Sequence, residues 1–298
     1  MQVNPNYNST LSAAISTSSA REQQLVSELS SGLRVSNLSA DPVAVSANVQ
    51  LEGMLSQLDS FVQGASGNQS MLQVSDSTLG EVVTQLTSAV SLATQAANDT
   101  LTPANLSSLA QKASAIRDSV LSLANTSYQG SYLFSGSAGQ TKPFTLTNTT
   151  SPASVTYAGD GVTRYTQTPG GQSIALNVPG SAIFTASGAS VLGSLNQLVS
   201  DLQSGSSVGV AADTTSLTTA LAAFSTQRAL LGSSLSQLNA TSTYAQTEMT
   251  VLAVQQTRLL SADTAAVATA LSTAEVQHQA LISVVSGLSQ NDLFSYIK

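Results

Sequence analysis

Residues 44–96 read AVSANVQLEGMLSQLDSFVQGASGNQSMLQVSDSTLGEVVTQLTSAVSLATQA, and apolar side chains recur in them at alternating steps of three and four residues. Fourteen of the sixteen positions reached in this way from Ala44 are apolar. A repeat of about 3.5 residues held this long predicts one continuous helix with an apolar seam, roughly 80 Å long at ~1.5 Å per residue. Such a seam is stable only when another helix covers it.

The predicted helix has start and stop signals at both ends. Pro42 suits a first helical turn, and Asp41 before it is a suitable N-cap. Downstream, the sequence NDTLTP at 98–103 interrupts the repeat. We expect Thr102 to cap a second helix that runs from Pro103 to about Asn125, antiparallel to the first.

The C-terminal half predicts a matching set of helices. A short helix is expected over 191–202 and a second long one from Asp213, broken at 261–263 before a last helix that ends near Leu288. The N-terminal seam over 11–33 is weaker, because Ser18 and Glu22 occupy two of its positions. The residues predicted for the seams and for contacts between subunits are Leu25, Leu29, Leu33, Leu51, Leu58, Phe61, Leu72, Leu79, Leu86, Leu231, Leu235, Leu238, Leu252, Leu259, Leu293, Phe294 and Tyr296.

Between the helical halves the repeat changes to short, β-branched runs. Four strands are expected in a compact β insert, at 144–147, 154–157, 162–166 and 173–178. The turn sequences GDG at 159–161 and PGG at 169–171 are expected to close hairpins. Four aromatic residues stand where the helix gives way to the strands, and we expect them to form the core of this junction; they are Tyr128, Tyr132, Phe134 and Phe144.

The expected fold class is mainly α with a β insert: a long antiparallel coiled coil or helical bundle built from both halves of the chain and carrying a small β-rich domain. The expected domains are a helical rod (43–128 and 188–261) and an outer β-rich domain (129–187). The third expected part consists of the terminal helical segments, 1–42 and 262–298, which we expect to become ordered on assembly.

Charge and composition exclude several classes of function. A net charge of −7 argues against nucleic-acid binding, and no basic amphipathic or long apolar stretch points to a membrane. Only 8% of residues are charged, so Ser, Thr, Gln and Asn occupy the outward helix positions. One interpretation is that neighbouring copies cover these uncharged faces in an assembly; the other is an extracellular surface with little charge.

No catalytic, cofactor or metal site is expected. The chain has no Cys and a single His, His278, which is expected to be a solvated helix residue. No serine lies in a G-x-S-x-G elbow, and the glycine-rich segments lack the lysine of a phosphate-binding loop. The sequence therefore favours a structural protein over an enzyme.

Several short motifs resemble one family of bacterial motility proteins. LSSGLR at 29–34 with SADP at 39–42 is similar to the N-terminal turn of flagellins and flagellar hook-associated proteins. YQGSYLFSG at 128–136 with TKPF at 141–144, and DLFSYI at 292–297, resemble the hook–filament junction branch that adjoins flagellin. YAGDG at 157–161 and NVPG at 177–180 are further points of likeness.

This resemblance implies a structural subunit that is exported through the flagellar apparatus without signal cleavage. The implied partners are other copies of the chain in a ring, the adjacent hook-side junction protein, flagellin and an export chaperone. The alternatives are a flagellin-type filament subunit and a secreted coiled-coil adhesin or effector. Arg34 and Asp41 flank the N-terminal turn, and we expect them either to fix it or to meet a neighbouring subunit; otherwise they are two solvated charges.

Overall fold

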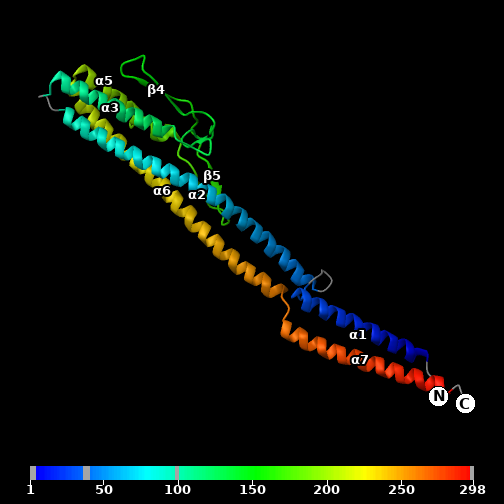
Figure 1. Ribbon diagram of the computed structural model, residues 1–298. Coiled ribbons are helices and arrows are strands. Elements are labelled where there is room, and N and C mark those ends of the chain that lie inside the picture. The colour runs from blue at the N-terminus through cyan, green and yellow to red at the C-terminus, as the bar shows by residue number, and fades with distance from the viewer. Residues whose placement is uncertain (1–4, 36–40, 98–100, 296–298) are drawn as a thin grey trace. The chain divides into compact units, whose positions relative to one another are not determined.

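The structure is a computed structural model that describes residues 5–35, 41–97 and 101–295, with the backbone alone described at 5–8 and 288–295 (Figure 1). It divides into two compact units, which are treated separately below. Unit 1 comprises Met1–Ser56 and Glu248–Lys298, and unit 2 comprises Gln57–Thr247. Both units draw on the two halves of the sequence, as expected for helices that pair across a central insert.

The helices account for most of the described chain. Their bounds are α1 Pro5–Ser31, α2 Pro42–Ala96, α3 Pro103–Ala124, α4 Gly180–Ile183, α5 Val191–Ser204, α6 Ser207–Leu260 and α7 Thr264–Ser295. The predicted class, a helical bundle with a small β-rich part, is confirmed. Asp41 caps α2 by accepting a hydrogen bond from the Ala44 amide at 3.0 Å, and Thr102 caps α3 through the Asn105 amide at 3.3 Å.

The start of α6 differs from the prediction. The helix begins at Ser207 rather than at Asp213, because Gly205 adopts a left-handed conformation (φ 75°) that ends α5 and lets a new helix start at once. Ser206 then serves as the cap, its hydroxyl accepting a hydrogen bond from the Gly209 amide at 3.1 Å. Asp213 therefore lies inside the helix, where its side chain is buried and does not cap the helix.

Helix α2 buries its apolar seam unevenly along its length. Every seventh position is buried, namely Ala44, Leu51, Leu58, Ala65, Leu72, Leu79, Leu86 and Ala93. The alternate positions are half-buried or exposed as far as Asn68 but buried from Ser75 onward. The C-terminal part of α2 is therefore covered on a wider face than its N-terminal part.

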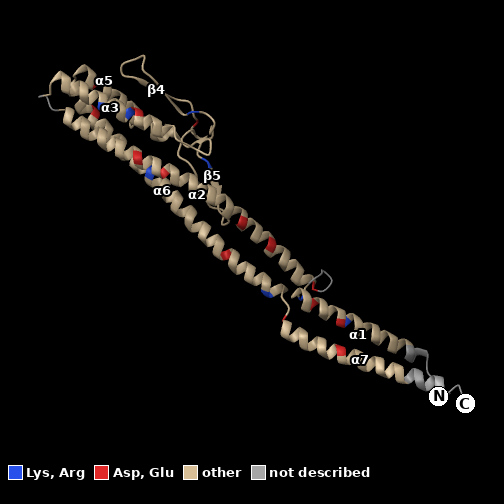
Figure 2. Ribbon diagram, in the orientation of Figure 1, with Lys and Arg blue, Asp and Glu red and all other residues tan. Residues whose placement is uncertain are grey.

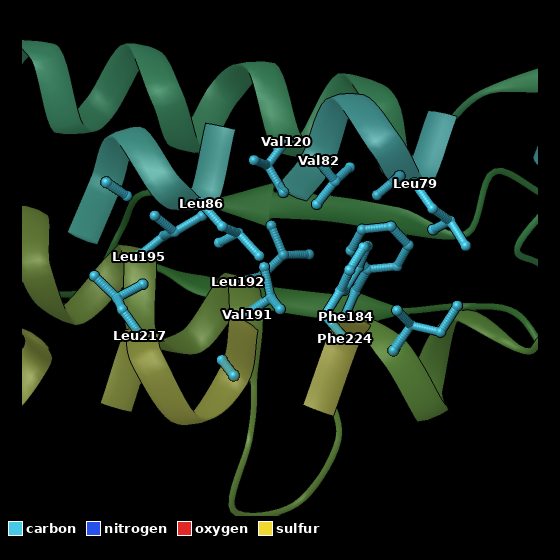
Figure 3. Packing of buried hydrophobic residues seen from close by; sticks show 14 of the residues in the cluster. Leu79, Val82, Leu86, Val120, Phe184, Val191, Leu192, Leu195, Leu217 and Phe224 are labelled. Carbon is cyan, nitrogen blue, oxygen red and sulfur yellow. The ribbon is translucent and has the colours of Figure 1, made fainter. Parts of the chain in front are cut away.

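In unit 2, α2, α3, α5 and α6 enclose one apolar core, which Figure 3 shows in part. Leu79, Val82 and Leu86 of α2 lie in the same cluster as Val191 and Leu192 of α5. On the flank of this core, the guanidinium of Arg228 in α6 makes two hydrogen bonds to the Asp76 carboxylate in α2, at 2.9 and 3.2 Å. This bidentate pair fixes the register of α6 against α2 and raises the pKa of Arg228.

The β-rich part is three separate two-stranded ladders rather than one compact sheet. The strands are β1 Ser127–Tyr128, β2 Ser131–Tyr132, β3 Phe144–Thr147, β4 Ser154–Tyr157, β5 Tyr165–Gln167 and β6 Ser173–Ala175. Antiparallel pairs join β1 to β2, β3 to β4 and β5 to β6. Residues 169–171 close the β5–β6 hairpin as predicted, but 159–161 close none, because β4 and β5 pair with other strands.

Candidate assembly interface

Two breaks in the helices of unit 1 are held to each other by backbone hydrogen bonds. The Arg34 amide donates to the Leu260 carbonyl at 2.8 Å, and the Ala262 amide donates to the Gly32 carbonyl at 2.9 Å. Leu33 and Ser261 thereby form an isolated antiparallel bridge. The turn after α1 and the α6–α7 break are thus one paired structure, and α1 packs along α7 beyond it.

Arg34 and Asp41 lie within this paired turn. The Arg34 guanidinium contacts the Asp41 carboxylate at 3.1 Å and the Leu259 carbonyl at 3.2 Å. Hydrogen bonds from the Ala44 amide and then from Arg34 hold the pKa of Asp41 below its usual value. Both side chains are partly exposed, at 49% and 30%, so the pair is screened by solvent and orients the turn rather than stabilising it strongly. A contact with a neighbouring subunit stays a prediction.

Unit 1 buries little of its apolar surface. Among described residues its buried apolar side chains are Leu25, Val35, Ala44, Leu51, Leu252 and Ala274. Eleven of the sixteen large hydrophobic residues that stand exposed belong to this unit, namely Val26, Leu29, Leu33, Val43, Val49, Met54, Val251, Val254, Val276, Ile282 and Val284. A concentration of exposed apolar side chains in one unit is consistent with a surface that another chain covers.

A shallow apolar groove of about 410 Å³ forms part of this surface. It is lined by Ala47, Gln50, Leu51 and Met54 of α2 and by Gln255, Arg258 and Leu259 of α6. Charged residues are sparse along the ribbons of α2 and α6 in Figure 2, and Arg258 is the charged residue in the lining of the groove. Few charges would need to be desolvated if a second chain packed here.

The predicted seam residues fall into two groups. Those of unit 2 lie in its own core: Leu72, Leu79, Leu86 and Leu238 are fully buried, Leu58 and Leu231 nearly so, and Phe61 and Leu235 half-buried. Those of unit 1 are mixed, since Leu25, Leu51 and Leu252 are buried while Leu29 and Leu33 are 37% and 39% exposed. Leu259 is half-buried. Tyr296 and the side chains of Leu293 and Phe294 lie outside the described residues.

The junction of helix and strands is built around an aromatic cluster in unit 2. The ring of Phe184 lies 5.3 Å from the rings of both Phe134 and Phe144, and 5.5 Å from the ring of Phe224 in α6, between centroids. Phe144 also lies 5.0 Å from Tyr157. Phe134 and Phe144 are therefore central, whereas Tyr128 packs half-buried against the cluster and Tyr132 is half-buried.

Polar side chains fasten the loops around this cluster. The Asn125 side chain, at the C-cap of α3, exchanges two hydrogen bonds with the backbone of Phe144, at 2.9 and 3.0 Å. The Asp160 carboxylate accepts from the Ser137 and Val162 amides at 2.7 and 3.1 Å and from the Ser137 hydroxyl. These bonds, the Ser137 hydroxyl first, lower the pKa of Asp160. The aspartate of 159–161 therefore ties two loops together instead of closing a hairpin.

Gly180 is required by the closeness of the same cluster. A Cβ there would lie 2.6 Å from the Phe144 ring and 2.7 Å from the Phe134 carbonyl oxygen, which already accepts a 2.8 Å hydrogen bond from the Gly180 amide. Any side chain at position 180 would force the backbone around Gly180 away from the Phe144 ring. The quoted motifs at 128–136, 141–144, 157–161 and 177–180 thus meet around one cluster. Sequence reasoning expected the aromatic residues of 128–144 to form the junction core, but it placed 159–161 in a hairpin turn and 173–178 in a strand.

No group of three or more His, Cys, Asp or Glu side chains that could hold a metal ion gathers among the described residues. His278 is half-buried rather than solvated, and its Nδ1 has no hydrogen-bond partner among them. Within that same part of the chain, no helix is both long and apolar enough to cross a bilayer.

Comparison with known proteins identifies the two helical halves. Residues 3–139 match the bacterial flagellin N-terminal helical region, and residues 214–297 match the bacterial flagellin C-terminal helical region. Together these regions cover most of the chain. They leave out residues 140–213, which hold β3 to β6, α4, α5 and the first turns of α6.

The similar sequences and the similar solved structures are flagellar proteins. Flagellar hook-associated protein 3 of Salmonella typhimurium is 32% identical over 133 residues, which is 44% of this chain and 42% of that protein. The chain therefore matches less than half the length of this relative. The crystal structure of Xanthomonas campestris FlgL superposes with a TM-score of 0.62 at 16% identity, covering 70% of this chain and 99% of that one.

The flagellar junction protein FlgL of Legionella pneumophila gives a TM-score of 0.59 at 18% identity, over 72% of this chain and 99% of that one. At these identities the likeness to the solved structures establishes the fold. The family rests on the two flagellin helical regions, one in each half of the sequence. The chain belongs to the flagellin family of bacterial flagellar proteins and is similar, within it, to hook-associated protein 3.

Proposed function

We propose that this protein is a structural subunit that joins the flagellar hook to the flagellin filament. The observation that carries the proposal is the contrast between the two units. Unit 2 encloses its own core, whereas unit 1 leaves eleven large apolar side chains exposed beside a hydrogen-bonded turn. Two similar proteins are named flagellar hook-associated protein 3 and flagellar junction protein FlgL. These names support a role at the hook–filament junction over other roles of a flagellar subunit.

The mechanism is burial of unit 1 by neighbouring subunits. Apolar area removed from water contributes about 25 cal/mol per Å², so cover of these eleven side chains would favour association against the cost of ordering their surroundings. Uncharged flanks rich in Ser, Thr and Gln lower the desolvation cost of close helix packing. Neighbouring copies in a ring, the hook-side junction protein and flagellin are the proposed partners.

Export and placement follow from the same proposal. The subunit would travel through the flagellar export apparatus, held by a chaperone that covers the apolar terminal helices, and would then assemble outside the cell. The β-rich part of unit 2 would face outward. Unit 1 would contribute its α1–α7 pair to the packed wall of the structure.

Deleting the gene tests this role. We expect hooks to form at normal number while flagellin is shed into the medium, because filament subunits lose their attachment point. Counting hooks and filaments by electron microscopy, together with immunoblots of the medium, measures this. Filaments still attached at normal number in the deletion strain would contradict the proposal, and restoration of filaments by a plasmid copy is the control.

A flagellin-type filament subunit is the second candidate, and the match to both flagellin helical regions favours it. The two roles differ in what purified protein does alone. A filament subunit polymerises into long filaments when seeded, whereas a junction subunit forms rings or short caps at most. Long filaments grown from this chain alone would assign it to the second role.

A further inference from the structure

The corner between α5 and α6 contains a carboxyl group that the assembly role does not use. Asp213 lies in the second turn of α6 with only 3% of its surface exposed. Its Oδ2 atom is buried and has no hydrogen-bond partner among the described residues. A buried, unpartnered carboxylate is costly, so the group is expected to hold a proton or to share one.

A second carboxylate, on Asp201 of α5, lies against the face of α6 that carries Gly209 and, one turn later, Asp213. The Asp201 Oδ2 accepts a hydrogen bond from the Gln197 side-chain amide at 3.1 Å. A Cβ built at Gly209 would lie 2.5 Å from this oxygen, so the carboxylate rests directly against the first turn of α6. The Asp201 backbone carbonyl meanwhile accepts from the Ser206 amide at 3.0 Å, which closes the corner.

Asp213 is buried within reach of the Asp201 charge. Burial first, and then the charge of Asp201, raises the pKa of Asp213 to about 7. A cavity of about 110 Å³ beside Asp201 has a mixed lining: Asp201, Ser206 and Ser207 are polar, and Ala96, Leu101, Leu106, Gly205 and Val210 complete it. This cavity gives water a route to Asp201 if the corner loosens.

The positive charges on α3, which packs against α5, are Lys112 and Arg117, and Arg117 pairs with Asp118 at 2.9 Å. The last described turns of α2, from Val82 to Ala97, carry no charged residue, and α3 carries none before the exposed Lys112. On α5 and the start of α6, Asp201 and Asp213 are themselves the ionisable groups. Asp99, in the α2–α3 connection, lies outside the described residues.

We propose that Asp201 and Asp213 share one proton and act as a pH-operated latch on the α5–α6 corner. With the proton present, Asp213 donates a hydrogen bond to the Asp201 carboxylate, which remains favourably placed at the N-terminal end of α6. Without it, two negative charges lie close together while Asp213 is buried. The corner then opens toward the neighbouring cavity, and water solvates both groups.

The pH dependence has a definite sign. Asp213 has a pKa of about 7 in the closed corner and, once open and solvated, one near the ordinary 3.8, so the closed form binds the proton more tightly. The stability of the closed corner is therefore highest at acid pH, falls as pH rises from about 4, and levels off above about 7. Over that range the opening equilibrium constant should rise about tenfold per pH unit, or roughly a thousandfold in all.

Residue-resolved hydrogen exchange of the full chain, corrected for intrinsic exchange rates, measures this opening. We expect the amides of 205–213 to show an opening constant that rises from pH 4.5 to 7 and then levels off. Asp213→Asn keeps a side-chain donor but cannot titrate, so its opening constant should not change with pH. Glu81→Gln, which neutralises an exposed carboxylate of α2 in the same unit, should behave like the parent protein.

The carboxyl ¹³C shift of Asp213 keeps the test valid even if the Asn variant does not fold. Titration near pH 7 in the parent protein, moving lower in Asp201→Asn, supports the latch. Titration near pH 4, opening that does not vary with pH in the parent protein, or the same pH dependence in the Asp213→Asn variant would each overturn it. None of these readouts depends on the junction role, so each hypothesis can fail alone.

Discussion

Phe184→Ala should lower the free energy of unfolding of unit 2 by about 3–5 kcal/mol, the range for removal of a fully buried aromatic side chain. Phe184 is 0% exposed, and its ring contacts those of Phe134, Phe144 and Phe224. Its loss leaves a cavity where the strands meet α6. Denaturant titration followed by circular dichroism measures the change.

The matched control is Tyr165→Ala, which removes an aromatic ring that is 63% exposed on β5. Its effect should stay within about 0.5 kcal/mol, as for most surface substitutions. Equal, small effects of the two substitutions would mean that the aromatic cluster is not the centre of the junction. A partial loss in Phe184→Leu would show that ring volume, rather than any feature of the backbone, is what matters.

Leu25→Asp is expected to abolish filament attachment while leaving unit 2 folded. Leu25 is 3% exposed in α1, and a carboxylate there would be buried without a partner, at a cost of more than ~3 kcal/mol to the α1–α7 pair. Motility and attached filaments per cell, counted in a deletion strain that expresses the variant, provide the measurement. This prediction rests on the proposed junction role.

Ser27→Asp places the same charge at an exposed position two residues along the same helix. We expect it to keep more attachment than Leu25→Asp, because it leaves the α1–α7 pair intact. Wild-type motility with Leu25→Asp would contradict a role for the pair in assembly. If both variants fail while circular dichroism shows normal helix content in Ser27→Asp, the exposed face of α1 itself contacts a neighbour.

The long helices were predictable because their signals are local and repeated. The heptad repeat from Ala44 and the caps at Asp41 and Thr102 each depend on residues a few positions apart. The β3 and β4 strands match the predicted 144–147 and 154–157 for the same reason. Periodicity makes such elements recognisable in the sequence, although packing against other elements is what stabilises them.

The features that sequence reasoning missed depend on contacts between distant residues. Asp160 was assigned to a hairpin turn because of its neighbouring glycines. In the structure its carboxylate instead accepts a hydrogen bond from the distant Ser137 amide, which joins the two loops. Phe224 fitted the seam of α6, and nothing local indicated that its ring would meet Phe184. Asp213 resembled a helix cap, and only the fold shows that it is buried beside Asp201.

The exposed apolar surface of unit 1 was predictable in kind but not in detail, and its role as an interface stays a prediction. The low charge of the chain and its apolar repeat indicated surfaces that another chain would cover. Which seam residues a single chain buries and which it leaves exposed depends on how many helices surround each one. Leu72 and Leu29 both occupy seam positions in the sequence, yet Leu72 is fully buried and Leu29 is 37% exposed.

Where this chain sits on the intact organelle is the most direct test of the junction role. Gold-labelled antibodies against the β-rich part of unit 2, applied to purified hook–filament complexes, should mark a single narrow band at the distal end of the hook. Label spread along the whole filament, or no label on the organelle at all, would contradict the account.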